Sequence, residues 1–309
     1  MTDAVVERSE EDIAKGSQSF AAAARLFDRA TRDDAVMLYA WCRHCDDVID
    51  GQVAGHGHST NFRDGQRKRL AELRQKTSAA LAGNFSGDYI FEALHRVVIG
   101  HDIPHRHPQE LLTGFEMDVE QRRYRTIGET LDYCYHVAGV VGVMMAMIMG
   151  VRERAVLDRA SDLGLAFQLT NIARDVVDDA RAGRIYIPDE LLVRQGIGEI
   201  VPEDRDQWPR LHAAALDLLD LAENYYQSAY AGLPALPARS AWAIAAARRI
   251  YRAIGQKLRA GGPSAWDQRV STTKAEKVAL LTAGLGDVAI TRLYRATRPR
   301  EGLWQRPRD

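Results

Sequence analysis

Two pairs of aspartates, Asp46/Asp50 and Asp175/Asp179, are each spaced four residues apart within otherwise apolar, helix-like segments. Residues four apart share one face of an α-helix, so each pair directs two carboxylates the same way. Like charges in an apolar neighbourhood repel one another and lose hydration, so a cation must compensate them. A divalent metal is the expected cation, and metals bound to carboxylates commonly hold a diphosphate. The spacing therefore predicts two metal-binding helices.

Polar neighbours extend both pairs into stripes along their helices. Tyr39 and Arg43 precede the first pair by helical steps, and Gln168 and Asn171 precede the second. Buried amides and carboxylates without partners are costly, so a protein core is not normally built this way. Too few other polar positions remain beside the stripes to make a solvent-facing surface. The stripes are therefore typical of a binding site.

A third pair with the same spacing, Asp158/Asp162, has a different context. The chain contains 26 aspartates, so chance alone should give roughly two such pairs, and three are present. This pair begins a predicted helix among Arg152, Arg154 and Arg159. We expect a solvated first turn, in which the helix dipole favours the carboxylates.

Composition excludes several classes of protein. The 309 residues carry a net charge of -1, so no overall field points to nucleic acid. The acidic N-terminus lacks the apolar core of a signal peptide, and three cysteines favour a reducing cytoplasm. The most apolar run, Val137 to Val151, is shorter than a membrane span and predicts a buried helix. A cytoplasmic protein is expected.

Helical periodicity covers almost the whole chain, and no dense Gly/Pro linker divides it. We predict an all-α fold in a single domain, 1–309, with flexible tails at 1–9 and about 298–309. A short turn is expected at 188–194. Helices are predicted near 10–28, 32–50, 61–82, 87–100, 108–123, 127–150, 153–181, 206–231, 236–260 and 274–297.

The helix predicted at 127–150 is rich in small and soft residues. Gly139 and Gly142 leave room beside its backbone, and Met144 and Met145 offer adaptable apolar surface. This composition favours tight helix packing, a tunnel for a long hydrocarbon, or both.

Several segments, in order, resemble the squalene and phytoene synthase family, and most closely its bacterial phytoene synthases. The resemblance covers nearly the whole chain, from GSQSF (16–20) to RVSTTKAEK (269–277). Its most specific parts are YAWCRHCDDVID (39–50) and GLAFQLTNIARDVVDDARAGRIYIP (164–188). It implies the class I isoprenoid synthase fold, an all-α helical bundle around a central apolar cavity.

The resemblance also implies roles for individual residues. The four aspartates of the two pairs would coordinate Mg²⁺ or Mn²⁺ ions that bridge the substrate diphosphates. The expected phosphate contacts are Arg43, Arg174 and Arg269, with Lys274 assisting. The other substrate-binding and catalytic positions are Gln168, Asn171, Ser19, Phe20, Tyr39, Tyr186 and Tyr251. Asp118 matches the family's acidic position on a middle helix, and an ion pair with Arg122 is the equal alternative.

The implied reaction joins two geranylgeranyl diphosphates head to head. A cyclopropylcarbinyl intermediate, prephytoene diphosphate, forms first and then rearranges to phytoene with release of both diphosphates, the first committed step of carotenoid biosynthesis. No NADPH is expected. Three alternatives remain: a dehydrosqualene or squalene synthase using farnesyl diphosphate, a head-to-tail prenyl diphosphate synthase, for which DDVID also fits, and a non-catalytic lipid-binding scaffold.

The arginine-rich tail, Ala289 to Asp309, permits two interpretations. It is either a frayed end or a segment that docks transiently on the anionic inner face of a membrane. Contacts with neighbouring carotenoid-pathway enzymes are also expected of a chain with this role.

Overall fold

The computed structural model describes residues 3–16, 23–51, 63–294 and 299–308. Every regular element in these ranges is a helix, so the predicted all-α fold is confirmed. The α-helices and shorter helical turns are α1 (Ala4–Gly16), α3 (Arg29–Asp50), α4 (Gln66–Leu81), α5 (Tyr89–Gly100), α6 (Arg106–Val119), α7 (Ile127–Cys134), η1 (Tyr135–Gly139), α8 (Val140–Ile148), α9 (Arg154–Arg181), α10 (Asp189–Arg194), α11 (Trp208–Tyr230), η2 (Leu233–Ala235), α12 (Ala238–Gly261), η3 (Gly262–Asp267) and α13 (Lys274–Tyr294).

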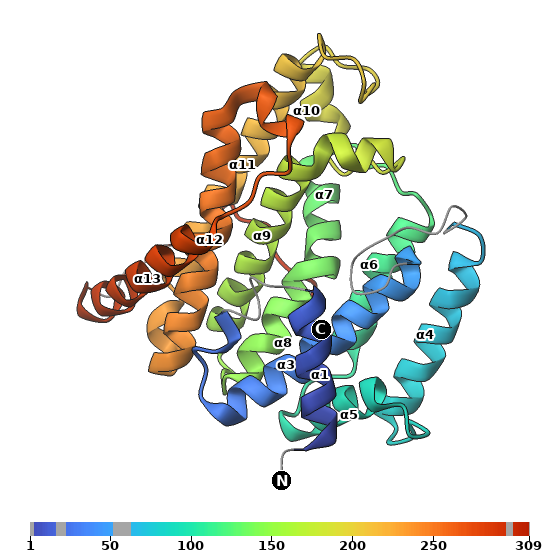
Figure 1. Cartoon of the computed structure of the whole chain (residues 1–309), viewed down its shortest axis with the longest axis vertical. Coiled ribbons are helices and arrows are strands. Elements are labelled where there is room, and N and C mark those ends of the chain that lie inside the picture. The colour runs from blue at the N-terminus through green and yellow to red at the C-terminus, as the bar shows by residue number, and fades with distance from the viewer. Residues whose placement is uncertain (1–2, 17–22, 52–62, 295–298, 309) are drawn as a thin grey trace.

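Helix α9 is the central element of the arrangement (Figure 1). It packs against α11, α8, η1 and α12, while α3 contacts α1, α5 and α8 on the other side of the molecule. Helices α4 and α6 pack together, and α13 packs on α12 at the periphery. The two helices that carry the aspartate pairs, α3 and α9, thus share α8 as a neighbour and otherwise pack mainly against different helices.

Glycines let the wall formed by η1 and α8 approach α9 closely. A Cβ atom added to Gly142 would lie 2.4 Å from the carbonyl oxygen of Ala160, and one added to Gly164 would lie 2.4 Å from that of Ala138. The preceding turn, Tyr135–Gly139, is a π-helix, a local widening often found near functional sites. The small residues therefore do bring these two backbones together.

The same stretch, Ile127–Ile148, is the one described helix long and apolar enough to cross a membrane by length and composition. In the structure, 72% of its most apolar window is buried inside the protein. Contact with α9 and α6 therefore accounts for its apolar character, as the sequence predicted.

Specific residues begin and end the first aspartate-bearing helix. Asp28 caps α3, because its carboxylate accepts a hydrogen bond from the backbone N–H of Thr31 at 3.1 Å. The helix ends after Asp50, since Gly51 adopts a left-handed conformation with φ of 61°. Trp41, Cys45 and other apolar residues bury the opposite face of the helix. The carboxylates therefore project from a firmly packed element.

Two predicted boundaries are wrong. The helix expected over 10–28 begins earlier, at Ala4 in α1, and no helix reaches 28, because residues 25–27 form a turn and a bend and Asp28 caps α3. The turn expected at 188–194 contains a short helix, α10, which begins after Pro188. Periodicity alone did not reveal either change, because both depend on single capping or initiating residues.

Neither terminal segment is a free tail where the structure describes it. At the N-terminus, α1 begins at Ala4, and Val5 and Val6 are buried. The Oγ of Ser9 donates a hydrogen bond to the carbonyl oxygen of Val5 at 2.8 Å. The predicted flexible segment 1–9 is thus largely helical.

The C-terminal segment binds the third aspartate pair, which corrects two expectations. Asp158 and Asp162 are only 6% and 1% exposed, so they do not form a solvated first turn. Arg300 donates to both oxygens of Asp162 at 2.7 and 2.6 Å, and Arg306 donates to Asp158 at 2.7 Å. Guanidinium groups that pair this closely compensate the burial of both carboxylates.

Trp304 anchors the same segment by its ring and backbone. The indole lies 5.6 Å from the ring of Tyr135, and the backbone N–H of Trp304 donates to the hydroxyl of Tyr225 at 3.2 Å. Residues 299–308 therefore join η1, α9 and α11 into one unit, which we call the C-terminal clasp.

The close approach at Gly164 makes a testable prediction. Gly164→Ala should lower the free energy of unfolding by about 1–3 kcal/mol, because the new methyl group would overlap backbone atoms that cannot move aside. Thermal and denaturant unfolding measure the change. The matched control is Gly286→Ala in α13, where nothing lies within 4 Å, and it should stabilise the protein by up to about 1 kcal/mol. Equal losses in both variants would contradict the interpretation.

Candidate functional site

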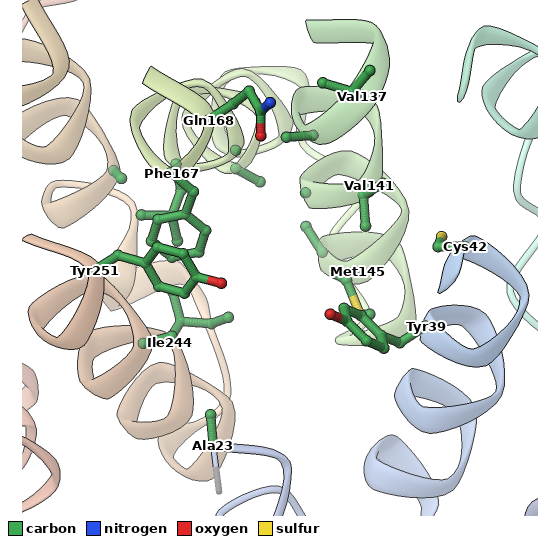
Figure 2. Close-up of a pocket in the computed structure, with 18 of the residues that line it drawn as sticks. Ala23, Tyr39, Cys42, Val137, Val141, Met145, Phe167, Gln168, Ile244 and Tyr251 are labelled. Atoms are coloured by element: carbon green, nitrogen blue, oxygen red, sulfur yellow. The ribbon is translucent and has the colours of Figure 1, made fainter. Parts of the chain in front are cut away.

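A cavity of about 430 Å³ lies between α3, α6, α8, α9 and α12. Its walls are mostly apolar, and most of its polar lining gathers toward the C-terminal half of α9, with Arg159 lining it near the other end of that helix. The hydroxyls of Tyr39 and Tyr251 face the cavity from opposite walls, with Gln168 at the polar end (Figure 2). Its volume falls within the usual range of small-molecule sites.

The apolar part of the cavity is long. Asn171 lines its polar end and Val156 its apolar end, and the rise of an α-helix separates these positions by about 22 Å along α9. The rings of Phe167 and Tyr251 stack at 4.1 Å between the two ends. The cavity thus has the shape expected for a chain-like apolar ligand with a polar head.

Asp46 lines the polar end of the cavity with Arg43, and Asp50 lies one turn further along α3. The guanidinium of Arg43 is 3.1 Å from a carboxylate oxygen of Asp46 and 3.1 Å from one of Asp47. The Asp46 side chain is 39% exposed, but it lines the cavity, so protein rather than open solvent surrounds it. Burial raises the pKa of Asp46 to about 7, and the charge of Asp50 adds to this effect.

The second pair lies on α9, and its two carboxylates differ in environment. Burial alone would raise the pKa of Asp175, but the guanidinium groups of Arg174 and Arg269 outweigh it and hold that pKa below its usual range. Arg174 donates from its Nε at 2.7 Å, and Arg269 from Nη2 at 3.2 Å. Asp179 has no such pairing among the described residues, and burial, followed by repulsion from Asp175, raises its pKa to about 8.

Asp118 on α6 lies close enough to both aspartate pairs for its charge to act on a member of each. Its carboxylate accepts hydrogen bonds from the hydroxyls of Tyr186 at 2.8 Å and Tyr133 at 3.2 Å. Burial raises its pKa to about 6, and its charge adds to the burial effect on both Asp46 and Asp179. The carboxylates of α3, α6 and α9 therefore lie within electrostatic range of one another.

Arg184 provides the positive charge between these helices. Both of its terminal nitrogens donate to the carboxylate of Asp50, and its charge also acts on Asp118 and Asp179. Acidic partners raise the pKa of Arg184 further above its ordinary range, although burial opposes them. This residue lies just after the end of α9, in a loop that brings it back toward α3.

Most of the sequence-predicted residues converge, with several exceptions. Tyr39, Arg43, Asp46, Gln168, Asn171 and Tyr251 line the cavity. Five further predicted residues do not line it, but their charges act on Asp46, Asp118 or Tyr251 at its polar end: Asp50, Asp175, Asp179, Arg174 and Arg269. Tyr186 was expected there too, but it is 9% exposed and stacks on Tyr133 at 4.8 Å beside Asp118 instead. Lys274 is exposed at the first residue of α13 and does not line the cavity. Ser19 and Phe20 lie outside the described residues.

Sequence reasoning underestimated Asp118 and missed Tyr133 and Arg184. The expected alternative partner of Asp118, Arg122, instead lies 3.8 Å from Asp132. A signal for Asp118 was available, because Leu111, Phe115 and Asp118 follow helical spacing and all line the cavity. No spacing signal marked Arg184, since it lies in a loop.

One buried oxygen at the site lacks a partner in the part of the chain that the structure describes. The side-chain Oδ1 of Asn171 is buried without a hydrogen bond, while its Nδ2 donates to Gln168 at 3.5 Å. A buried acceptor without a partner is costly, so it is available to a ligand.

Comparison with known proteins agrees with this geometry. Residues 13–276 match the squalene/phytoene synthase family. A protein named 15-cis-phytoene synthase from Paracoccus sp. (strain N81106 / MBIC 01143) is 55% identical over 309 residues, which cover 99% of each chain. One of the same name from Enterobacter agglomerans is 51% identical and covers 94% of this chain and 99% of its own.

Solved structures show the same architecture. A dehydrosqualene synthase in complex with a ligand superposes with a TM-score of 0.82 at 28% identity, covering 93% of this chain and 97% of the other. A squalene synthase from Alicyclobacillus acidocaldarius, at 22% identity, shares the fold with a TM-score of 0.71 and covers 84% and 94%. Since the match spans most of the chain and includes both aspartate-bearing helices, the chain belongs to the squalene/phytoene synthase family.

Proposed function

We propose that this protein is a 15-cis-phytoene synthase, a prenyltransferase of carotenoid biosynthesis. It condenses two geranylgeranyl diphosphates head to head through prephytoene diphosphate and releases two diphosphates. The observation that carries the proposal is a cluster of carboxylates and arginines, of which Arg43, Asp46 and Asp118 line one end of a long, mostly apolar cavity. Relatives of that name at 51–55% identity over nearly the full length support it.

The alternatives receive less support. The dehydrosqualene synthase structure is 28% identical to this chain, well below the phytoene synthases. A head-to-tail synthase would retain a diphosphate on its product, and none of the relatives described above has that activity as its name. A lipid-binding scaffold would gain nothing from carboxylates whose burial is costly.

The carboxylates fit divalent metal ions, Mg²⁺ or Mn²⁺. Hard oxygen ligands suit these cations, and the Oδ1 of Asn171 adds a neutral oxygen without another partner. Among the residues that the structure describes, no three histidine, cysteine or carboxylate side chains gather closely enough to hold a metal alone. This favours Mg²⁺ shared with a diphosphate, because that ion commonly binds through one or two carboxylates and substrate phosphates.

Asp46, Asp50, Asp175 and Asp179 would hold such ions, and Asp118, between them, would contribute to the same field. Bound metal would neutralise the charge that develops on a departing diphosphate. Arg43, Arg174 and Arg269 would hold the phosphate oxygens, for which planar guanidinium groups are suited. Lys274 is exposed, so its assisting role would require movement toward the diphosphate.

The remaining lining would protect and direct an allylic cation. Apolar walls exclude water, which would otherwise capture the cation. The rings of Tyr39, Tyr251 and Phe167 can stabilise positive charge without acting as nucleophiles. Gln168 would orient the diphosphate end, and Tyr186 would position Asp118 through its hydrogen bond. The departing diphosphate is the proposed proton acceptor in the last step.

We also propose that residues 1–309 act as one domain in the cytoplasm. Transient contact with a membrane and with neighbouring carotenoid-pathway enzymes suits a protein whose product does not dissolve in water.

Product analysis tests the activity. The purified protein, incubated with Mg²⁺ and geranylgeranyl diphosphate without NADPH, should form phytoene and release two diphosphates for each product molecule. Farnesyl diphosphate should react more slowly under the same conditions. A product that retains a diphosphate, or a requirement for NADPH, would refute the assignment.

The aspartate on α9 that binds two arginines should be essential. Asp175→Asn should lower kcat by at least about a thousandfold, because it removes one negative charge from the metal-binding set without changing side-chain size. The matched control is Asp178→Asn on the same helix, whose side chain is 62% exposed and pairs with Arg181. It should keep near-normal activity. Circular dichroism shows whether both variants fold, and comparable activity in the two would exclude the role of Asp175.

The raised pKa values predict a pH-dependent metal requirement. Protons compete with Mg²⁺ for Asp46 and Asp179, whose pKa values burial raises to about 7 and about 8. Raising the pH from about 7 to about 9 removes these protons, so the Mg²⁺ concentration for half-maximal activity should fall about tenfold. Mg²⁺ titrations of initial rate at each pH measure it. A requirement that stays constant or rises with pH would contradict the prediction.

A further inference from the structure

The outer face of α13 exposes an unusual amount of apolar surface. Eight large hydrophobic side chains are exposed in the described part of the chain, and five of them lie on this one helix. They are Val278, Leu285, Ile290, Leu293 and Tyr294, with exposed fractions of 63%, 48%, 51%, 76% and 78%. Such a concentration marks an interaction surface rather than the scattered apolar residues of an ordinary surface.

The charges of α13 are arranged unequally between its two faces. Its acidic residues bind the protein itself, since Asp287 is 4% exposed and accepts from Arg249 at 2.5 and 2.6 Å, and Glu276 binds Lys257 at 2.7 Å. The cations Lys274 and Arg292, near the two ends of the helix, are exposed. Glu276 remains 41% exposed, but Lys257 neutralises it, so the net outward-facing charge of this helix is positive.

The C-terminal end of α13 reaches the apolar end of the cavity. The guanidinium of Arg292 donates to the carbonyl oxygen of Leu236 at 3.1 Å, and the side chain of Leu236 lines the cavity. Leu236 precedes α12, whereas Tyr251, near the aspartates, lies about 20 Å further along that helix. Figure 1 shows α13 (red) at the edge of the molecule, crossing α12.

We propose that the outer face of α13 docks on an anionic lipid bilayer, next to the hydrocarbon end of the cavity. Apolar side chains enter the interfacial region, and the exposed cations contact the lipid headgroups. This docking proposal rests on the proposed function only for the advantage that docking would give, because a long hydrocarbon product needs an apolar phase to enter. The binding itself follows from the surface.

A second copy of this chain is a poorer partner for the same face. Antiparallel pairing of two α13 helices would bring Lys274 of each copy toward Arg292 of the other, and like charges across an interface are costly. An anionic surface satisfies both cations at once. The C-terminal clasp is not the docking element, because Arg300 and Arg306 are engaged with Asp162 and Asp158.

Vesicle sedimentation tests the proposal with the full chain. The protein should sediment with vesicles of phosphatidylglycerol and phosphatidylcholine, and less with phosphatidylcholine alone. The double variant Ile290→Glu/Leu293→Glu should weaken this binding at least about tenfold, because two carboxylates replace apolar side chains at the lipid surface. The matched control, Ile99→Glu/Val193→Glu, makes the same changes at residues 55% and 69% exposed on other helices, and it should bind normally.

Two outcomes would overturn the docking proposal. One is equal vesicle binding by the double variant and the wild type. The other is a wild-type dimer, seen by analytical ultracentrifugation, that the double variant dissociates without a change in vesicle binding. Activity on detergent-dispersed substrate should be the same in all three proteins. If none of them makes phytoene but the double variant alone loses vesicle binding, the proposed function fails and the docking surface stands.

Discussion

Desolvation of carboxylates at the polar end of the cavity is the constraint on which the site depends. Burial raises the pKa values of Asp46, Asp118 and Asp179, so each holds its proton more tightly than an exposed acid. Asp175 differs, because its two arginines keep it ionised. The result is a site with more acid groups than guanidinium groups can neutralise, and it therefore favours a cation that arrives with its own anionic ligand.

These carboxylates can act on a common ligand only if the helices that carry them are fixed relative to one another. Close contacts of Gly142 and Gly164 with backbone carbonyl groups hold η1 and α8 against α9. Gly51 ends α3 directly after Asp50. Carboxylates on packed helices keep their mutual distances better than carboxylates on loops. Arg184 is the exception, since it reaches Asp50 from a loop after α9.

The sequence predicted the fold class and the two aspartate-bearing helices, because helical spacing and apolar surroundings are local signals. It also predicted that Tyr39 and Gln168 would line the cavity, as they do. Contacts between distant segments could not be predicted in this way. Arg184 reaches Asp50 across 134 positions and Arg300 reaches Asp162 across 138, and neither pairing has a periodic signature. The burial of Asp162 was therefore missed, since its partner lies in a segment that looks like a tail.

The C-terminal clasp has a consequence for the order in which this protein can fold. Asp158 and Asp162 belong to the first turns of the central helix, yet their partners Arg306 and Arg300 are synthesised 148 and 138 residues later. A nascent chain that still holds residues 299–308 inside the ribosome lacks the guanidinium groups that pair with these two carboxylates, and among the described residues only the hydroxyl of Ser228 remains to donate to Asp162. The first turns of the central helix thus cannot complete their packing until residues 299–308 have left the ribosome and can bind them.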